Sequence, residues 1–114
     1  AYPRLALIEQ EVPDDRCDGL ALNAAVLEGT GTIRVQFVEE GGASYLAEAS
    51  IDTARRELQR AVVLFRQCKW GSFSKPDSDG KLQPAKIREI LVGINSKENS
   101  TAQMAVDGLE WVRF

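Results

Sequence analysis

Carboxylates are the only common acid–base groups that this chain offers for catalysis, because the sequence contains no histidine. Glycosidases use two carboxylates that flank the scissile bond, and three acidic pairs occur here: Asp14-Asp15, Glu39-Glu40, and Asp77 with Asp79. All three pairs lie in segments that read as turns, where carboxylates are normally solvated. The lack of histidine also removes the commonest zinc ligand and the usual base of serine and cysteine triads. We therefore expect a protein without catalytic activity.

The chain has two cysteines, Cys17 and Cys68. A nucleophilic cysteine needs a base or a cation that lowers its pKa, and without histidine neither cysteine gains support for that role. The two thiols could form one disulfide in an oxidising compartment, or they could remain separate and buried. The sequence leaves both alternatives open.

Several aromatic residues suit a different chemistry, the binding of carbohydrate. An aromatic ring stacks on the C–H-rich face of a pyranose, and a planar polar side chain can form two hydrogen bonds at once with the hydroxyls of the sugar. Trp70, in a long predicted loop, is the first candidate, followed by Tyr45 and then Phe73. Trp111 could face a ligand or the core, and the core is favoured because a terminal sandwich strand needs large inward residues. Period-two alternation allows eight polar side chains on one sheet face: Arg34, Gln36, Glu48, Arg60, Arg66, Asn95, Gln103 and Arg113. The candidates for binding among them are Arg34, Gln36, Arg66, Asn95 and Gln103.

Composition fits one soluble globular domain. The chain has 114 residues, 44% hydrophobic and 27% charged, and a chain of this size buries roughly two thirds of its unfolded surface. The net charge is −3 with scattered lysines and arginines, so nucleic acid is not an expected partner. No apolar run approaches a membrane span, and the first residues lack the charged segment followed by an apolar run that is typical of a secretory leader. We expect an already processed protein, or a module cut from a larger enzyme.

Short strands separated by turn signals must position these residues. The clearest strand is Thr32 to Glu39, where Ile33, Val35 and Phe37 alternate with Arg34, Gln36 and Val38. Asp52 to Arg60 contains helix-forming residues, and one helical turn could precede the strand there. The other predicted strands are Arg4 to Val12, Gly19 to Leu27, Ser44 to Ile51, Leu58 to Phe65, Ile87 to Ile94 and Met104 to Phe114. Two long loops, Gln67 to Gly80 and Asn95 to Thr101, join the last elements. The pattern predicts an all-β, antiparallel β-sandwich.

A series of motifs in the second half of the chain resembles one family. It comprises Val62-Val63-Leu64-Phe65, then Trp70 and Phe73, then Asp79-Gly80 followed by Leu82, the Ile87 and Ile90 pair, and Val106-Asp107-Gly108-Leu109. This order is similar to the galactose-binding-like carbohydrate-binding modules of glycoside hydrolases, such as families 4 and 11. The resemblance covers roughly residues 19 to 114. It implies a jelly-roll sandwich that binds polysaccharide without cleaving it.

The same resemblance implies further expectations. The ligand would be a plant cell-wall polysaccharide, β-glucan or another hemicellulose, and the module would be secreted and linked to a catalytic domain. Similar modules often hold a structural calcium ion, for which Asp107 is the candidate ligand, with Glu9 or Glu11 contributing. Asp107 could instead bond the backbone of the turn at Gly108. Asp77-Ser78-Asp79-Gly80 begins like a calcium loop but lacks the bidentate glutamate that would complete it, so we interpret it as a turn.

The competing interpretation is a structural sandwich that packs against a catalytic domain or an assembly partner, with Trp70 buried at that contact. An assembly-factor domain related to mitochondrial complex I is similar in strand pattern and belongs to this class.

Overall fold

The computed structural model of this chain describes residues 4–6, 16–29, 31–52, 54–71, 74–75, 82–96 and 103–113. These residues form two antiparallel sheets and two short 3₁₀ helices, η1 (Phe65–Gln67) and η2 (Pro84–Lys86). Within these ranges no helix is long and apolar enough to cross a membrane. The strands are β1 (Arg4–Ala6), β2 (Gly19–Glu28), β3 (Gly31–Glu39), β4 (Ser44–Ala49), β5 (Gln59–Leu64), β6 (Lys69–Trp70), β7 (Ile87–Ser96) and β8 (Gln103–Val112).

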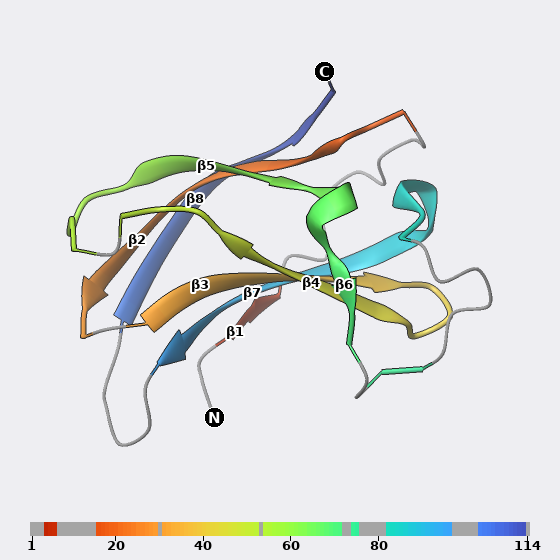
Figure 1. The fold of residues 1–114 in the computed structure, drawn as a ribbon, viewed down its shortest axis with the longest axis horizontal. Helices are drawn as coiled ribbons and strands as arrows, with labels where there is room; N and C mark the ends of the chain where they lie inside the picture. The colour runs from red at the N-terminus through yellow and green to blue at the C-terminus, as the bar shows by residue number, and fades with distance from the viewer. Residues whose placement is uncertain are drawn as a thin grey trace.

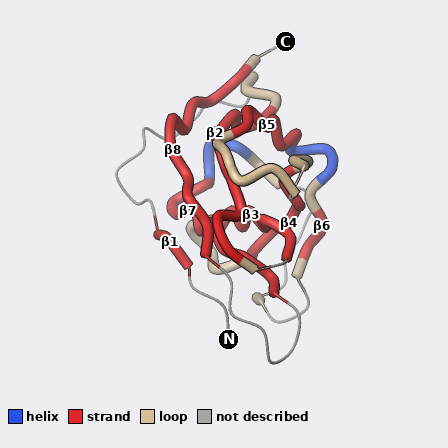
Figure 2. Tube along the Cα trace, turned by 90° about the vertical axis from the view of Figure 1, so that its left-hand side faces the viewer, coloured by secondary structure: helices blue, strands red, loops and turns tan. Residues whose placement is uncertain are grey.

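The two sheets pack face to face (Figure 1). The larger sheet has the strand order β1-β7-β3-β4-β6, and the smaller one the order β5-β2-β8. Figure 2 looks along the layers and shows β5 and β6 on the same side of the sandwich, with η1 beside them. The predicted antiparallel β-sandwich is thus confirmed.

The alternation predicted along β3 sets the core. Ile33, Val35 and Phe37 are fully buried, and their partners on β7 are Ile94, Val92 and Ile90. The smaller sheet contributes Leu20, Leu22, Ala24 and Val26 of β2 from the other side. Phe37 also contacts two aromatic rings, with ring centroids 5.3 Å from Phe65 and 6.3 Å from Trp111. Burial of these side chains is the main stabilising contribution, at roughly 1.5–3 kcal/mol for each large one.

A β-bulge interrupts the pairing of β2 with β8. Ala21 pairs with Glu110, but Asn23 pairs with Asp107, so β8 has one extra residue. Gly108 lies at this bulge with φ of 62°, a left-handed conformation that glycine adopts without steric cost. An added Cβ would also lie 2.8 Å from Nδ2 of Asn23. The backbone conformation at this bulge therefore explains the glycine that follows Asp107 in the sequence.

Several strand ends differ by one or two residues from the sequence prediction, and three differences concern Trp70, β7 and η1. Trp70 does not lie in a loop, because Lys69 and Trp70 pair with Leu46 and Tyr45 as the edge strand β6. A two-residue strand has no alternation that a sequence pattern could reveal. β7 continues through Asn95 to Ser96, since its pairing with Thr32 and Gly31 extends the ladder. The last residue of the predicted strand Leu58 to Phe65 belongs to η1 instead.

Candidate functional site

β6 covers only part of β4, and this leaves one side of the sandwich partly open. The two residues of β6 pair with Tyr45 and Leu46, while Ala47, Glu48 and Ala49 pair only with β3. The chain passes from β5 through η1 to β6 on this same side (Figure 2). Side chains from β3, β4, β5, η1 and β6 consequently meet here.

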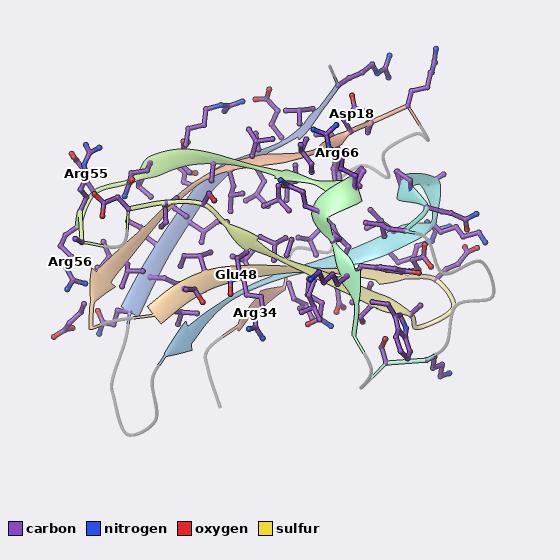
Figure 3. The ribbon with its side chains drawn as sticks, viewed as in Figure 1. Asp18, Arg34, Glu48, Arg55, Arg56 and Arg66 are labelled. Atoms are coloured by element: carbon purple, nitrogen blue, oxygen red, sulfur yellow. The ribbon has the colours of Figure 1, made fainter. Side chains whose placement is uncertain are left out.

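One hollow of about 400 Å³ lies at the edge of the larger sheet, beside β6. Arg34 and Glu48 are cross-strand partners on the outer face of that sheet, and they line the hollow together with Trp70. Trp70 pairs with Tyr45, which pairs with the buried Phe37, so the Trp70 side chain starts from the inner face of the sheet edge. Figure 3 shows Arg34 and Glu48 extending into the same region from neighbouring strands. The remaining described lining residues are Leu46, Ala47, Gln67 and Lys69.

A second hollow of about 560 Å³ lies between β4 and β5, at the junction of the two sheets. Val62 and Leu64 form its apolar wall, and Arg66 of η1 lies at one side. Its other described lining residues are Ala47, Glu48, Ser50 and Gln67. Because Ala47, Glu48 and Gln67 line both hollows, we treat the two as one depression and call it the β4 groove.

Trp70 is the exposed aromatic residue of the β4 groove. Its side chain is 42% exposed, while its indole Nε1 donates a hydrogen bond to the carbonyl of Lys75 at 3.1 Å. The edge strand β6 fixes its backbone against Tyr45. The ring is thus anchored at two points and still offers apolar surface, which is the arrangement that stacking on a sugar requires.

Gln36 lies on the same outer sheet face as Arg34, but its side chain is buried and bonded within the protein. It is only 8% exposed, and its Nε2 donates to Oγ of Ser44 at 3.1 Å. Ser44 also accepts a hydrogen bond from Gly71 through its carbonyl. Gln36 therefore helps to hold the chain after β6 against β4, next to the groove.

The other residues predicted from sequence are not gathered at the groove, except Arg66. Tyr45 is 2% exposed, because it pairs with the buried Phe37 and so faces the inside of the sandwich. Trp111 packs against the core with its ring 6.1 Å from that of Phe65. Gln103 is exposed at the start of β8, on the other sheet, and Asn95 pairs with Thr32 near the end of β7. Phe73 lies outside the described residues, as do Asp14, Asp15, Asp77 and Asp79.

A further hollow of about 510 Å³ adjoins the β5 end of the β4 groove and shares Leu64 and Arg66 with it. Its described lining consists of Cys17, Asp18, Leu64, Phe65, Arg66, Leu82 and Pro84. Phe65 is 9% exposed and belongs to the core, so no exposed aromatic ring is available there for stacking. The β4 groove is the better candidate for a carbohydrate.

Asp107, the candidate calcium ligand, does not lie in a cluster of acidic side chains among the described residues. Asp107 is exposed, and its Oδ1 accepts a hydrogen bond from the backbone N–H of Gly108 at 2.8 Å. Among the described residues no group of three histidine, cysteine, aspartate or glutamate side chains could hold a metal ion. Glu9 and Glu11 lie outside these residues. We derive no function from a bound calcium ion.

The two cysteines are free thiols in this structure. Both pack against the core, and the Sγ of Cys68 lies 3.6 Å from the carbonyl oxygen of Leu64. Burial raises the pKa of the Cys68 thiol from its ordinary value of 9.0 to about 12. Cys68 is therefore a neutral, unreactive thiol at physiological pH.

Sequence reasoning named Glu48 among the polar residues of one sheet face but did not select Gln67 or Lys69. Glu48 follows from the predicted hairpin, because a register that pairs Phe37 with Tyr45 also pairs Arg34 with Glu48. Lys69 adjoins Trp70 in sequence, but only the pairing of β6 with β4 shows that it lines the groove. The contribution of Gln67 depends on the path of η1 between the sheets, which has no sequence signal.

Comparisons with protein-family models, curated proteins and solved structures find no match to this chain. The candidate site is therefore defined by its geometry and by the motifs of the sequence.

Proposed function

We propose that this chain is a non-catalytic carbohydrate-binding module whose β4 groove holds a polysaccharide chain. The observation that carries the proposal is the combination of one anchored, exposed tryptophan with planar polar side chains along a continuous depression. Carbohydrate sites combine these two elements because a pyranose has an apolar face and a rim of hydroxyls.

Each end of the groove has a distinct part in this binding. Trp70 would stack on a sugar ring at the β6 end of the groove. Glu48 and Gln67, in the middle, would accept and donate hydrogen bonds to hydroxyls, since both line the two hollows. Val62 and Leu64 would contact the apolar side of a second sugar near β5.

The sheet scaffold keeps the entropic cost of such binding low. The groove is formed on strands and on a short helix between them, so few side chains must be ordered when the ligand arrives. Attached to a glycoside hydrolase, a module of this kind raises the local concentration of the catalytic domain on its substrate. On this proposal the protein acts outside the cell, on plant cell-wall polysaccharide such as β-glucan or a hemicellulose.

Native affinity electrophoresis tests the proposal. The wild type and Trp70→Ala would be run in gels that contain barley β-glucan, xyloglucan, xylan, glucomannan or polygalacturonate. Leu27→Ala is a matched control, because Leu27 is 45% exposed and does not line the groove. We expect retardation of the wild type and of Leu27→Ala in at least one gel, and a loss of affinity of about tenfold or more in Trp70→Ala. If no polysaccharide retards the wild type, the proposed function is wrong.

A further inference from the structure

The charges of the β4 groove differ in sign from those of the whole chain. The protein has a net charge of −3. Yet the charged residues that line the groove, among those described, are three cations and one carboxylate: Arg34, Arg66, Lys69 and Glu48. A concave surface of one sign attracts a ligand of the opposite sign even when the rest of the protein repels it.

The groove arginines also differ from the other arginines in their partners. Outside the groove, Arg55 pairs with Glu57, Arg60 lies 4.0 Å from Glu110, and Arg88 pairs with Glu40 at 2.7 Å. Arg56 donates to the carbonyls of Val26 and Gly29, and both Arg16 and Arg113 have interactions as well.

Arg34 and Arg66, by contrast, make no hydrogen bond or ion pair with any described residue. Figure 3 shows Arg66 on η1 and Arg34 on β3, with Glu48 on the strand between β3 and the edge of the sheet. A guanidinium that lines a hollow without a protein partner can bond a carboxylate with two parallel N–H···O contacts.

From these observations we propose that the ligand of the β4 groove is an acidic polysaccharide, one whose sugars carry carboxylates. This inference rests on the proposed function and specifies its ligand. Arg34 binds a uronate carboxylate at the Trp70 end, and Arg66 binds a second one at the β5 end. Lys69 adds a mobile positive charge beside Trp70. Glu48 lies between the two arginine positions and accepts hydrogen bonds from sugar hydroxyls.

The test compares two forms of one polymer. The probes are polygalacturonate and its fully methyl-esterified form, which share a backbone and differ in charge, together with dextran sulfate as a sulfated polyanion. Affinity would be measured by isothermal titration calorimetry for the wild type, Arg34→Gln and Arg66→Gln. Arg55→Gln is the control, because it removes an arginine that is exposed and outside the groove.

We expect the wild type to bind polygalacturonate about tenfold more tightly than the methyl ester. Each groove variant should lose about fivefold to tenfold in affinity for polygalacturonate, and Arg55→Gln should lose none. An increase in salt from about 0.05 M to about 0.5 M should weaken the wild-type complex, because screening reduces the attraction of exposed charges.

Each contradictory result would show whether the acidic ligand, the proposed function or both are wrong. Equal binding of the two galacturonan forms, or tighter binding of a neutral glucan, would overturn the acidic ligand and leave the carbohydrate-binding function standing. Tighter binding of dextran sulfate than of polygalacturonate would overturn the assignment to carboxylates. Failure to bind any saccharide would overturn both proposals.

Discussion

Arg34 and Glu48 are direct cross-strand partners on β3 and β4, yet they form no ion pair with each other. Oppositely charged residues at such positions usually attract, with a contribution of about 0.2–1 kcal/mol. Both side chains instead line the hollow that contains Trp70. Because neither side chain makes a hydrogen bond or ion pair with the other, both have hydrogen-bonding positions open to a ligand, and this relationship underlies the predictions on binding.

The substitution Glu48→Gln should strengthen the binding of an acidic polysaccharide. Glutamine keeps the shape and one acceptor oxygen of the side chain but removes the only described carboxylate that lines the groove. We expect the affinity for polygalacturonate to rise roughly twofold to fivefold at low salt, as for a single partly exposed charge.

Glu57→Gln is the matched control for this change, since it removes the same charge at an exposed site outside the groove. The measurement is the dissociation constant from calorimetric titration. A lower affinity in Glu48→Gln than in Glu57→Gln would show that Glu48 does not repel the ligand.

The substitution Gly19→Ala should destabilise the fold. Gly19 pairs with Leu64 across the β2–β5 ladder, and an added Cβ would lie 2.2 Å from the carbonyl oxygen of Val63. Since this neighbour is backbone, the two strands must separate locally, at a cost of about 1–3 kcal/mol. At Gly41 an added Cβ would meet nothing within 4 Å, so Gly41→Ala should change the free energy of unfolding by less than about 0.5 kcal/mol. Urea denaturation of both variants measures the difference, and equal stabilities would refute the close approach.

Cys68 should make the stability of the fold sensitive to alkaline pH. Its pKa rises from 9.0 to about 12 on folding because burial disfavours the thiolate. Between these two values the unfolded chain releases the proton and the folded chain keeps it, so the free energy of unfolding falls as the pH increases. Below about pH 9 the thiol is neutral in both states and has no effect on the pH dependence.

Denaturant titrations in reducing buffer, at pH 8 and at pH 10.5, would measure this effect. Because lysines and tyrosines titrate in the same range, the comparison is between the wild type and Cys68→Ala. The wild type should lose more stability between the two pH values than the variant does. Equal losses would mean that the folded thiol ionises as readily as the unfolded one.

The three long strands of the larger sheet, β3, β4 and β7, were largely predictable, because apolar residues alternate regularly along β3 and its hairpin partner. Ile33, Val35 and Phe37 were expected on one face and Arg34, Gln36 and Val38 on the other, and the burial of the first three confirms this pattern. A strand with one buried face must alternate with period two. The distribution of strands between the sheets, in contrast, depends on long-range pairing. No local pattern shows that β7 inserts between β1 and β3.

The candidate site was less predictable than the fold. Trp70, Arg34 and Arg66 were selected by residue type, and the structure places all three along the β4 groove. Tyr45 was selected on the same grounds but is buried, since it pairs with Phe37 and faces the inside of the sandwich. Residue type shows what a side chain can bind. Whether the side chain is accessible depends on the sheet face from which it starts and on the pairing of the strands around it.

Mapping of the saccharide contacts by NMR tests the central claim, that the β4 groove binds a polysaccharide chain. Backbone and indole N–H signals of ¹⁵N-labelled protein would be followed during titration with an oligogalacturonate and with a β-glucan oligosaccharide. With at least one of them, we predict shifts at Leu46 to Glu48, at Gln67 to Trp70 and at the indole N–H of Trp70, and none along the β2–β8 ladder. Shifts confined to other surfaces, or no shifts with either ligand, would contradict the assignment of the groove as the binding site.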